Sequence, residues 1–188
     1  MKRAALAVEL SRLIRMSLKK NDAAIAAAGR ACRDVLAAGG QILAFGNGGS
    51  AAEAQHFAAE LVNKFGAVRP ALRAVSLTTD TSVLTSIGND LSFAAIFSRQ
   101  IEALGRAGDV ALALSTSGTS PNIVRGLAAA RKRGLITVGL TGAAGGKMGP
   151  LCDFLIRVPS ASTPRIQEVH LILLHLLVAE IEELRDRP

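Results

Sequence analysis

The spacing in the sequence that most suggests chemistry joins His56 to Glu60. Residues four apart share one face of a helix, so this imidazole and carboxylate can converge on one metal ion. Taken alone, the pattern is more typical of an exposed pair on a helix surface. Glu53 comes three residues before His56 and is placed to orient its ring. The segment offers half of a metal site and needs further ligands from elsewhere.

Two polar loops have the composition of anion sites. GNGGSA at residues 46–51 fits the loose G-x-G-x-x-A dinucleotide pattern, but the acidic residue expected about 20 positions later is missing. STSGTS at residues 115–120 has five hydroxyls directly before Pro121, which suits the first turn of a helix. Capping by Ser120 explains one hydroxyl, whereas phosphate binding at a helix start uses several. Because neither loop contains lysine, a small phosphorylated sugar is favoured over a triphosphate.

A second histidine of interest, His175, lies in the apolar stretch LILLHLLVA. A buried histidine needs a polar partner, and a core histidine is the ordinary explanation for a lone one. Gln167 lies eight residues earlier, about 12 Å along a helix axis at ~1.5 Å per residue. We therefore expect either a loosened first turn at Gln167 or two side chains that serve different edges of one site. His170 is about 140° around the helix from His175 and is interpreted as structural.

The elements that must position these residues alternate between strand and helix. Residues 4–37 are predicted to be helical in one or two pieces, with Asn21-Asp22 as a cap or kink. Five apolar runs, each followed by a turn, predict strands over residues 41–45, 72–77, 110–114, 135–140 and 153–158. A final helix starts at Pro164 and ends near Leu184. The pattern predicts an α/β fold, a three-layer α-β-α sandwich with a five-stranded parallel sheet.

No linker divides the chain, which predicts one domain over residues 1–188, with a helical segment (1–38) and an α/β core (39–188). The opening helices precede the first strand, so we expect them to pack on the flank of the sheet or on a neighbouring subunit. No apolar stretch is long enough to span a membrane. Cys32 and Cys152 lack metal-type spacing and are expected to be buried and reduced, as in a cytoplasmic protein.

The net charge of +7 suggests nucleic acid until its position is considered. Residues 1–20 contain six basic residues and one acidic residue, a net of +5, so the other 168 residues contribute only +2. The chain also has no Trp or Tyr and only six Phe, too few for a surface that stacks single-stranded bases. A nucleic-acid partner is therefore not expected.

Four motifs identify a family resemblance. FGNGGSAAEAQHFAAEL (45–61), IGND (87–90), STSGTS (115–120) and RIQEVHLILLH (165–175) resemble the phosphoheptose isomerases of the sugar-isomerase (SIS) fold, nearly end to end. The resemblance implies conversion of sedoheptulose 7-phosphate into D-glycero-D-manno-heptose 7-phosphate, the first step toward activated heptose for lipopolysaccharide or other glycans. It also implies one zinc ion per subunit and a homotetramer with active sites between subunits.

The resemblance also assigns roles to residues. Those that would bind the phosphate are Ser50, Ser115, Thr116, Ser117 and Ser120. Those that would line the sugar are Asn47, Gly48, Gly49, Asn89 and Asp90, joined by Glu60 and Gln167. The metal ligands would be His56, Glu60, Gln167 and His175, with Glu60 and His175 also transferring protons. Lys64 replaces an arginine found in some members, which makes a substrate contact there doubtful.

Two readings of the chemistry remain open at this point. Because a carboxylate bound tightly to zinc is a poor base, either Glu60 is released during turnover or it keeps a free oxygen while zinc acts as the Lewis acid.

The main alternative function is a non-catalytic SIS protein that associates with a replication initiator; a sugar-phosphate sensor is a weaker one. Retention of both Glu60 and His175 favours the enzyme, because a scaffold needs neither.

Overall fold

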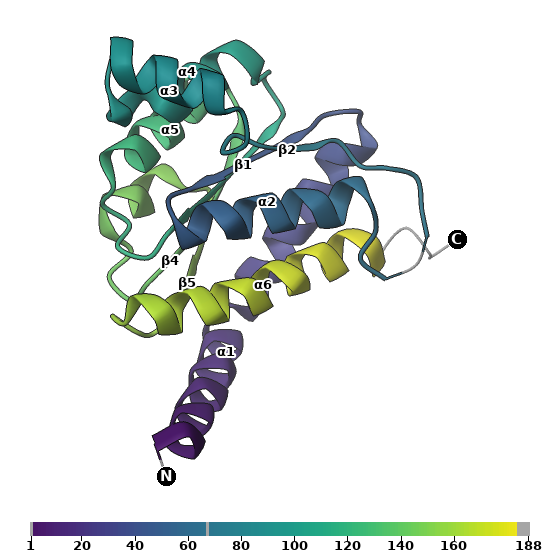
Figure 1. Ribbon diagram of the computed structural model, residues 1–188. Coiled ribbons are helices and arrows are strands. Elements are labelled where there is room, and N and C mark those ends of the chain that lie inside the picture. The colour runs from purple at the N-terminus through teal and green to yellow at the C-terminus, as the bar shows by residue number, and fades with distance from the viewer. Residues whose placement is uncertain (1, 67, 184–188) are drawn as a thin grey trace.

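A computed structural model describes residues 2–66 and 68–183 and contains a five-stranded parallel sheet (Figure 1). The strands lie in the order β2-β1-β3-β4-β5. Their bounds are β1 (Ile42–Gly46), β2 (Ala74–Ser76), β3 (Val110–Ser115), β4 (Ile136–Thr141) and β5 (Phe154–Arg157). All four strand pairs are parallel, with Ile42 opposite Val110 at the centre of the sheet. The predicted sheet is confirmed, strand by strand.

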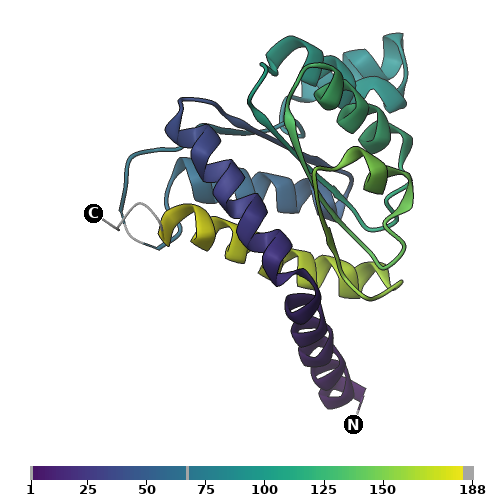
Figure 2. The same cartoon turned by 180° about the vertical axis from the view of Figure 1, so that it is seen from behind.

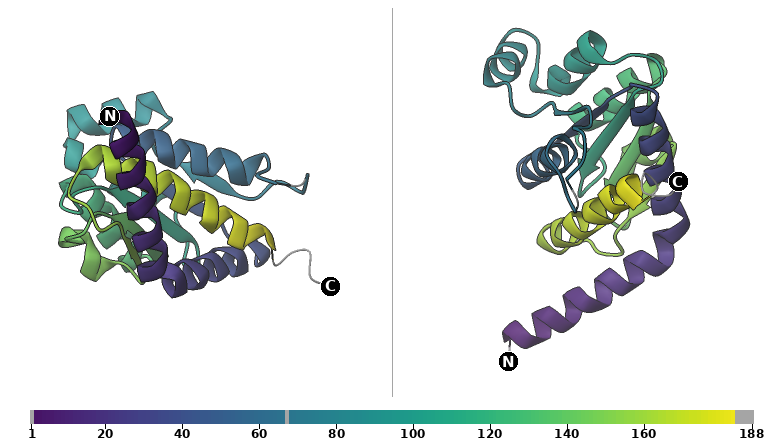
Figure 3. Two further views of the ribbon diagram at one scale, coloured as in Figure 1. Left: turned by 90° about the horizontal axis from the view of Figure 1, so that it is seen from below. Right: turned by 90° about the vertical axis from the view of Figure 1, so that its right-hand side faces the viewer.

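Helices cover both faces of this sheet, as the views from the front, behind and side show (Figures 1, 2 and 3). They are α1 (Lys2–Ala37), α2 (Gly49–Val62), α3 (Thr81–Asp90), α4 (Ile96–Leu104), α5 (Pro121–Lys132) and α6 (Thr163–Glu183). Two short 3-10 helices span Phe93–Ala95 and Gly146–Leu151. None of the helices in the described ranges is both long and apolar enough to cross a bilayer.

Alternate side chains of the central strands fill two separate hydrophobic cores. Ile42 and Ala44 pack with α1, α2 and α6, whereas Leu43 and Phe45 pack with α4 and α5. Each fully buried leucine or phenylalanine contributes about 1.5–3 kcal/mol relative to exposure. This burial on both faces confirms the predicted three-layer sandwich. Cys32 is buried and Cys152 half-buried, and both are free thiols.

The first helix is a single piece, one of the two predicted alternatives; it changes direction along its course (Figure 2), but no cap divides it at Asn21-Asp22. Asn21 instead turns its amide toward the edge of the sheet. Its Nδ2 donates to the Arg157 carbonyl at 3.0 Å, and its Oδ1 accepts from the Arg157 N–H at 3.0 Å. The second half of α1 packs on α6 and β5, as expected for the flank, while the first half extends away from the body (Figures 2 and 3).

The strand order places the two polar loops beside each other. In a 2-1-3-4-5 sheet the topology reverses between β1 and β3, and ligands bind beyond the carboxyl ends of the strands at that point. The GNGGSA turn follows β1, and the STSGTS loop begins at the last residue of β3. The fold therefore brings two loops that are about 70 residues apart in sequence to one edge of the sheet.

Candidate active site

A cavity of about 290 Å³ lies where three helices begin. The first turns of α2 and α6 and the residue before α5 all contribute to its wall. Free backbone N–H groups and the positive ends of helix dipoles both favour an anion at such a place. The polar residues that line the cavity are Asn47, Ser50, Ser115, Thr116, Ser120, Thr163 and Gln167, together with Gly48 and Gly49.

The glycine turn after β1 allows the backbone to enter α2 directly. Gly48 has a φ of 54°, in the region that favours glycine, and precedes the first residue of the helix. A Cβ atom on Gly46 would lie 2.5 Å from the Ser50 carbonyl oxygen, so the turn is too tight for a side chain there. The buried Ser50 hydroxyl is consequently held in the first turn of α2, at the wall of the cavity.

The hydroxyls of the second loop have different roles. The buried Ser115 Oγ accepts the Gly118 N–H at 3.1 Å, which shapes the loop. Ser117 is exposed, bonds to Thr119 and does not line the cavity, unlike the other predicted phosphate-binding hydroxyls. The Ser120 side chain makes no capping bond to α5, so its hydroxyl is free to serve a ligand. The structure thus groups four of the five predicted hydroxyls around one cavity.

A pair of amides ties the two loops together. Asn47 Nδ2 donates to Asn122 Oδ1 at 2.9 Å, and Asn122 Nδ2 donates to Asn47 Oδ1 at 2.7 Å. Asn122 also accepts the N–H of Ile123, so it is fixed to the start of α5. Asn122 was missed in the sequence, where nothing but its place at a helix start distinguishes it. The reciprocal bonds fix the relative position of the two loops.

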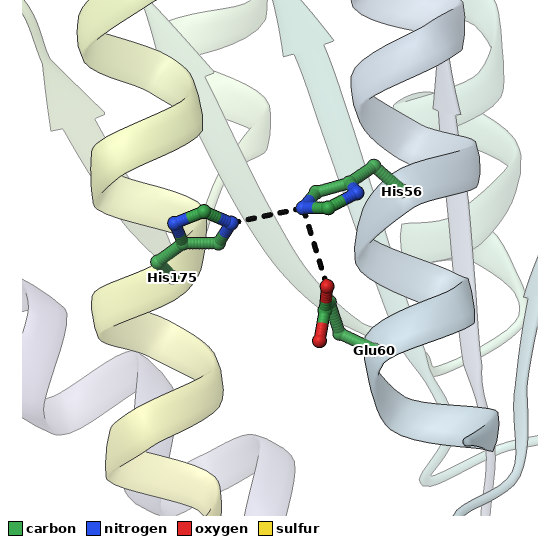
Figure 4. Close-up of side chains that lie close together, drawn as sticks. All are labelled: His56, Glu60 and His175. Atoms are coloured by element: carbon green, nitrogen blue, oxygen red, sulfur yellow. Dashed lines mark hydrogen bonds and ion pairs between the residues drawn. The ribbon is translucent and has the colours of Figure 1, made fainter. Parts of the chain in front are cut away.

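The predicted metal-type residues converge between α2 and α6 (Figure 4). The Nε2 atoms of His56 and His175 lie 2.8 Å apart, and His56 Nε2 is 3.4 Å from Glu60 Oε1. The side chains of His56 and Glu60 are 41% and 21% exposed, so solvent and a ligand can reach them. Two imidazole nitrogens and a carboxylate oxygen facing one point fit the donor set that zinc prefers. The tertiary fold therefore supplies the partner that His175 required.

Gln167 shares α6 with His175 and lies eight residues before it. Its amide packs against Gly49, where an added Cβ would lie 2.5 Å from Nε2, and it lines the anion cavity. The first turn of α6 is regular helix, so the loosened turn predicted as one alternative is absent. Metal ligation by Gln167 stays a prediction.

Asn89 and Asp90 lie at the exposed end of α3, where Asn89 Nδ2 donates to Asp90 Oδ1 at 2.8 Å. Neither residue lines the cavity or joins the His–Glu cluster within this chain. Lys64 is exposed and follows the end of α2. The structure therefore does not bring these three residues to the site in a single chain.

The expectation that Glu53 orients His56 is wrong. The Glu53 carboxylate makes no hydrogen bond to His56, and its Oε2 lies 3.9 Å from Nδ1 of the fully buried His170. Burial raises the pKa of Glu53 to about 7, an effect reduced by a hydrogen bond with Ser50. Burial also lowers the pKa of His170 to about 4. Glu53 and His170 thus form a buried polar pair, and the structural role of His170 stays a prediction.

Comparisons with known proteins agree with this geometry. The model of the SIS domain family matches residues 7–142, so the fold and the site define a SIS-domain protein. The chain is 58% identical over 153 residues to the phosphoheptose isomerase of Paramagnetospirillum magneticum, covering 81% of this chain and 80% of that protein. It belongs to the phosphoheptose isomerase family.

Solved structures support the same family. The phosphoheptose isomerase of Neisseria gonorrhoeae has a TM-score of 0.90 and 44% identity, and the match covers 96% of this chain and 97% of that one. The enzyme from Francisella tularensis has a TM-score of 0.88 and 34% identity, covering 97% and 99%. These relatives are named as isomerases, and the non-catalytic alternative finds no support among them.

Proposed function

We propose that this protein converts sedoheptulose 7-phosphate into D-glycero-D-manno-heptose 7-phosphate through an enediol. The observation that supports this most directly is the course of α2, which begins at the anion cavity and carries His56 and Glu60 two and three turns later. A heptose 7-phosphate has its phosphate and its reacting carbonyl at opposite ends. One helix thus offers each end of such a substrate the groups that it needs.

In this proposal the cavity holds the phosphate. The hydroxyls of Ser50, Ser115, Thr116 and Ser120 and the N–H groups of the helix starts would donate hydrogen bonds to it. Asn47, Gly48, Gly49 and Gln167 line the same cavity and would contact the sugar next to it. Ser117, the fifth predicted hydroxyl, is exposed and does not line the cavity in this chain, so phosphate binding by Ser117 stays a prediction.

Isomerisation moves a proton between C1 and C2 and requires a general base and a general acid. We assign these roles to Glu60 and His175, which face each other across the gap between α2 and α6 (Figure 4). His56, Glu60 and His175 would hold a zinc ion, which supplies a Lewis acid for the substrate oxygen when it is bound. Glu60 Oε1 lies 3.4 Å from His56 Nε2, so Oε2 would be the oxygen that moves the proton.

The remaining parts of the proposal concern the assembly. We expect one SIS domain over residues 1–188, a cytoplasmic location and a homotetramer with active sites between subunits. Asn89 and Asp90 are exposed at the end of α3, where they are free to contact the sugar bound to another subunit. The product would enter the synthesis of ADP- or GDP-heptose for lipopolysaccharide core or other glycans.

The test compares two Glu→Gln variants in an isomerase assay on sedoheptulose 7-phosphate. We expect Glu60→Gln to lower kcat by about 10²- to 10⁴-fold, the usual contribution of a general base. Inhibition by inorganic phosphate should be unchanged, because the phosphate cavity is intact. Glu102→Gln, on the exposed surface of α4, should behave as wild type. Near-normal turnover by Glu60→Gln would reject the catalytic assignment, and inactive wild-type protein would reject the function.

A further inference from the structure

Two side chains outside the His–Glu cluster connect the ends of α2 and α6. Arg69 Nε donates to Glu182 Oε1 at 2.7 Å, and these side chains are only 10% and 16% exposed. Glu182 lies on α6, seven residues or two turns after His175, and so projects from the same face of the helix. Arg69 lies beyond the end of α2. The pair therefore joins the two helices that carry the cluster.

Arg69 also completes the hydrogen bonding of α2. Its Nη2 donates to the Glu60 carbonyl at 2.8 Å, and its Nη1 donates to the Leu61 carbonyl at 2.8 Å. The last carbonyls of a helix have no partner within it, and a cation at that end is favourable. The guanidinium holds the backbone of Glu60 itself through one of these bonds. Its planar fork allows it to bind Glu182 at the same time.

Glu182 reaches the cluster from the other side. Its carboxylate accepts the N–H groups of Phe65 at 3.2 Å and of Gly66 at 3.1 Å. The Phe65 ring packs against His175, with ring centroids 5.3 Å apart. Burial tends to raise the pKa of Glu182. The hydrogen bonds from Gly66 and Arg69 outweigh this effect and lower the pKa below its usual value, so the carboxylate is charged.

We infer that Arg69 and Glu182 are positioning residues that set the separation and orientation of Glu60 and His175. The inference rests on the proposed function for the chemistry that this geometry serves. The two proton-transfer groups come from different helices, so their separation depends on how α2 and α6 are fixed to each other. Displacement of a reacting group by 1 Å costs on the order of 10²-fold in rate. The Arg69–Glu182 ion pair therefore fixes α2 and α6 relative to each other at the site, in addition to contributing to stability.

The test uses Arg69→Met, Arg69→Lys and the milder Glu182→Gln. Thr137→Val is the matched control. Thr137 is buried at the amino end of β4, opposite the site, and its hydroxyl donates to the Leu151 carbonyl. The variant should therefore lower stability without affecting the site. The first readout is kcat and KM for sedoheptulose 7-phosphate. The second is the set of imidazole ¹⁵N resonances, which belong to only three histidines. His170 serves as an internal reference.

We expect Arg69→Met and Glu182→Gln to lower kcat on the order of 10- to 100-fold with KM changed less than about threefold. The resonances of His56 and His175 should shift while those of His170 remain. Arg69→Lys should restore activity only in part, since an ammonium lacks the fork. Thr137→Val should lower the unfolding midpoint with kcat and resonances unchanged.

Two results would reject the positioning role of Arg69 and Glu182. One is unchanged imidazole resonances of His56 and His175 in both Arg69→Met and Glu182→Gln. The other is a loss of kcat that Thr137→Val reproduces. Wild-type protein without turnover would reject the proposed function instead. In that case the imidazole spectra still decide whether Arg69 and Glu182 position the two histidines.

Discussion

Ser120 precedes α5 in the position of a helix cap and yet makes no capping bond. Capping serines are usually worth about 1 kcal/mol, so Ser120→Ala should cost less than that in the free energy of unfolding. A hydrogen bond to a charged ligand contributes about 1.5–3 kcal/mol, which predicts an increase in KM of roughly 10- to 100-fold. Steady-state kinetics and urea unfolding measure the two effects separately.

The neighbouring Thr119→Ala is the control, because Thr119 is exposed and does not line the cavity. It should leave KM unchanged. A Ser120→Ala protein with a normal KM and a clear loss of stability would mean that the residue caps the helix in solution and does not bind phosphate.

The buried pair of Glu53 and His170 predicts opposing effects of pH on stability. Burial raises the pKa of Glu53 from 4.5 to about 7, so its contribution is present below pH 4.5 and is lost as the pH rises toward 7. Burial lowers the pKa of His170 from 6.5 to about 4, so its contribution is present above pH 6.5 and is lost as the pH falls toward 4. Between pH 4.5 and 6.5 the two effects oppose each other.

Single variants should separate the pH dependence of stability that Glu53 causes from the one that His170 causes. Relative to wild type, the free energy of unfolding of Glu53→Gln should rise with pH from 4.5 to 6.5, because only the titration of His170 still affects stability there. That of His170→Gln should fall over the same range. Urea unfolding at several pH values measures both slopes, and slopes parallel to wild type would show that the two groups do not titrate as a buried pair.

At the scale of elements, Asn21 joins α1 to the open edge of the sheet. Its amide satisfies both the N–H and the carbonyl of Arg157, as a neighbouring strand would. Asn21→Leu should lower the free energy of unfolding by about 1–3 kcal/mol, because these backbone groups lose their partner. Asp22→Leu, at an exposed neighbouring position, should change it by less than about 0.5 kcal/mol. Equal effects of the two substitutions in denaturant unfolding would contradict this role.

The elements differ in how far the sequence predicts them. The five strands are apolar runs because both faces of the sheet are covered, and their observed bounds lie within two residues of the predicted ones. The helices α3 and α4 were missed. α3 contains no buried residue, although Leu84 and Ile87 lie three apart and pack partly buried against the second core, and its start is marked by Asp80, which accepts the Val83 N–H at 2.9 Å.

The site shows the same division between local and tertiary information. His56 and Glu60 share a helix, so their spacing alone predicts that they meet. His175 is 119 residues from His56, and Asn122 is 75 residues from Asn47, distances at which spacing says nothing about contact. Family resemblance supplied His175. Neither the spacing nor the family resemblance predicted the contact of Asn122 with Asn47. Neither predicted that Glu53 lies near His170 and makes no hydrogen bond to His56.

At the scale of the whole molecule, the first half of α1 projects from the body (Figure 3). Within the described part of one chain it meets the core only around Leu13, with the partly buried Leu10, Ile14 and Leu18, and helical segments of this length are marginal in water without tertiary packing. This segment nevertheless carries Leu6, Val8 and Met16 exposed on its surface. Exposed apolar side chains on a projecting helix favour association, and the proposed homotetramer gives this helix a neighbouring subunit on which to pack.

Leu6 provides the sharpest test of that association, since 43% of it is exposed within one chain. Burial of a leucine at an interface contributes about 1.5–3 kcal/mol, so Leu6→Glu should weaken assembly by roughly tenfold or more. Sedimentation velocity over a range of protein concentrations measures the shift. Ser11→Glu adds the same charge at another exposed position of the helix and should assemble as wild type. A wild-type monomer, or equal weakening by both variants, would show that this helix does not hold subunits together through its apolar side chains.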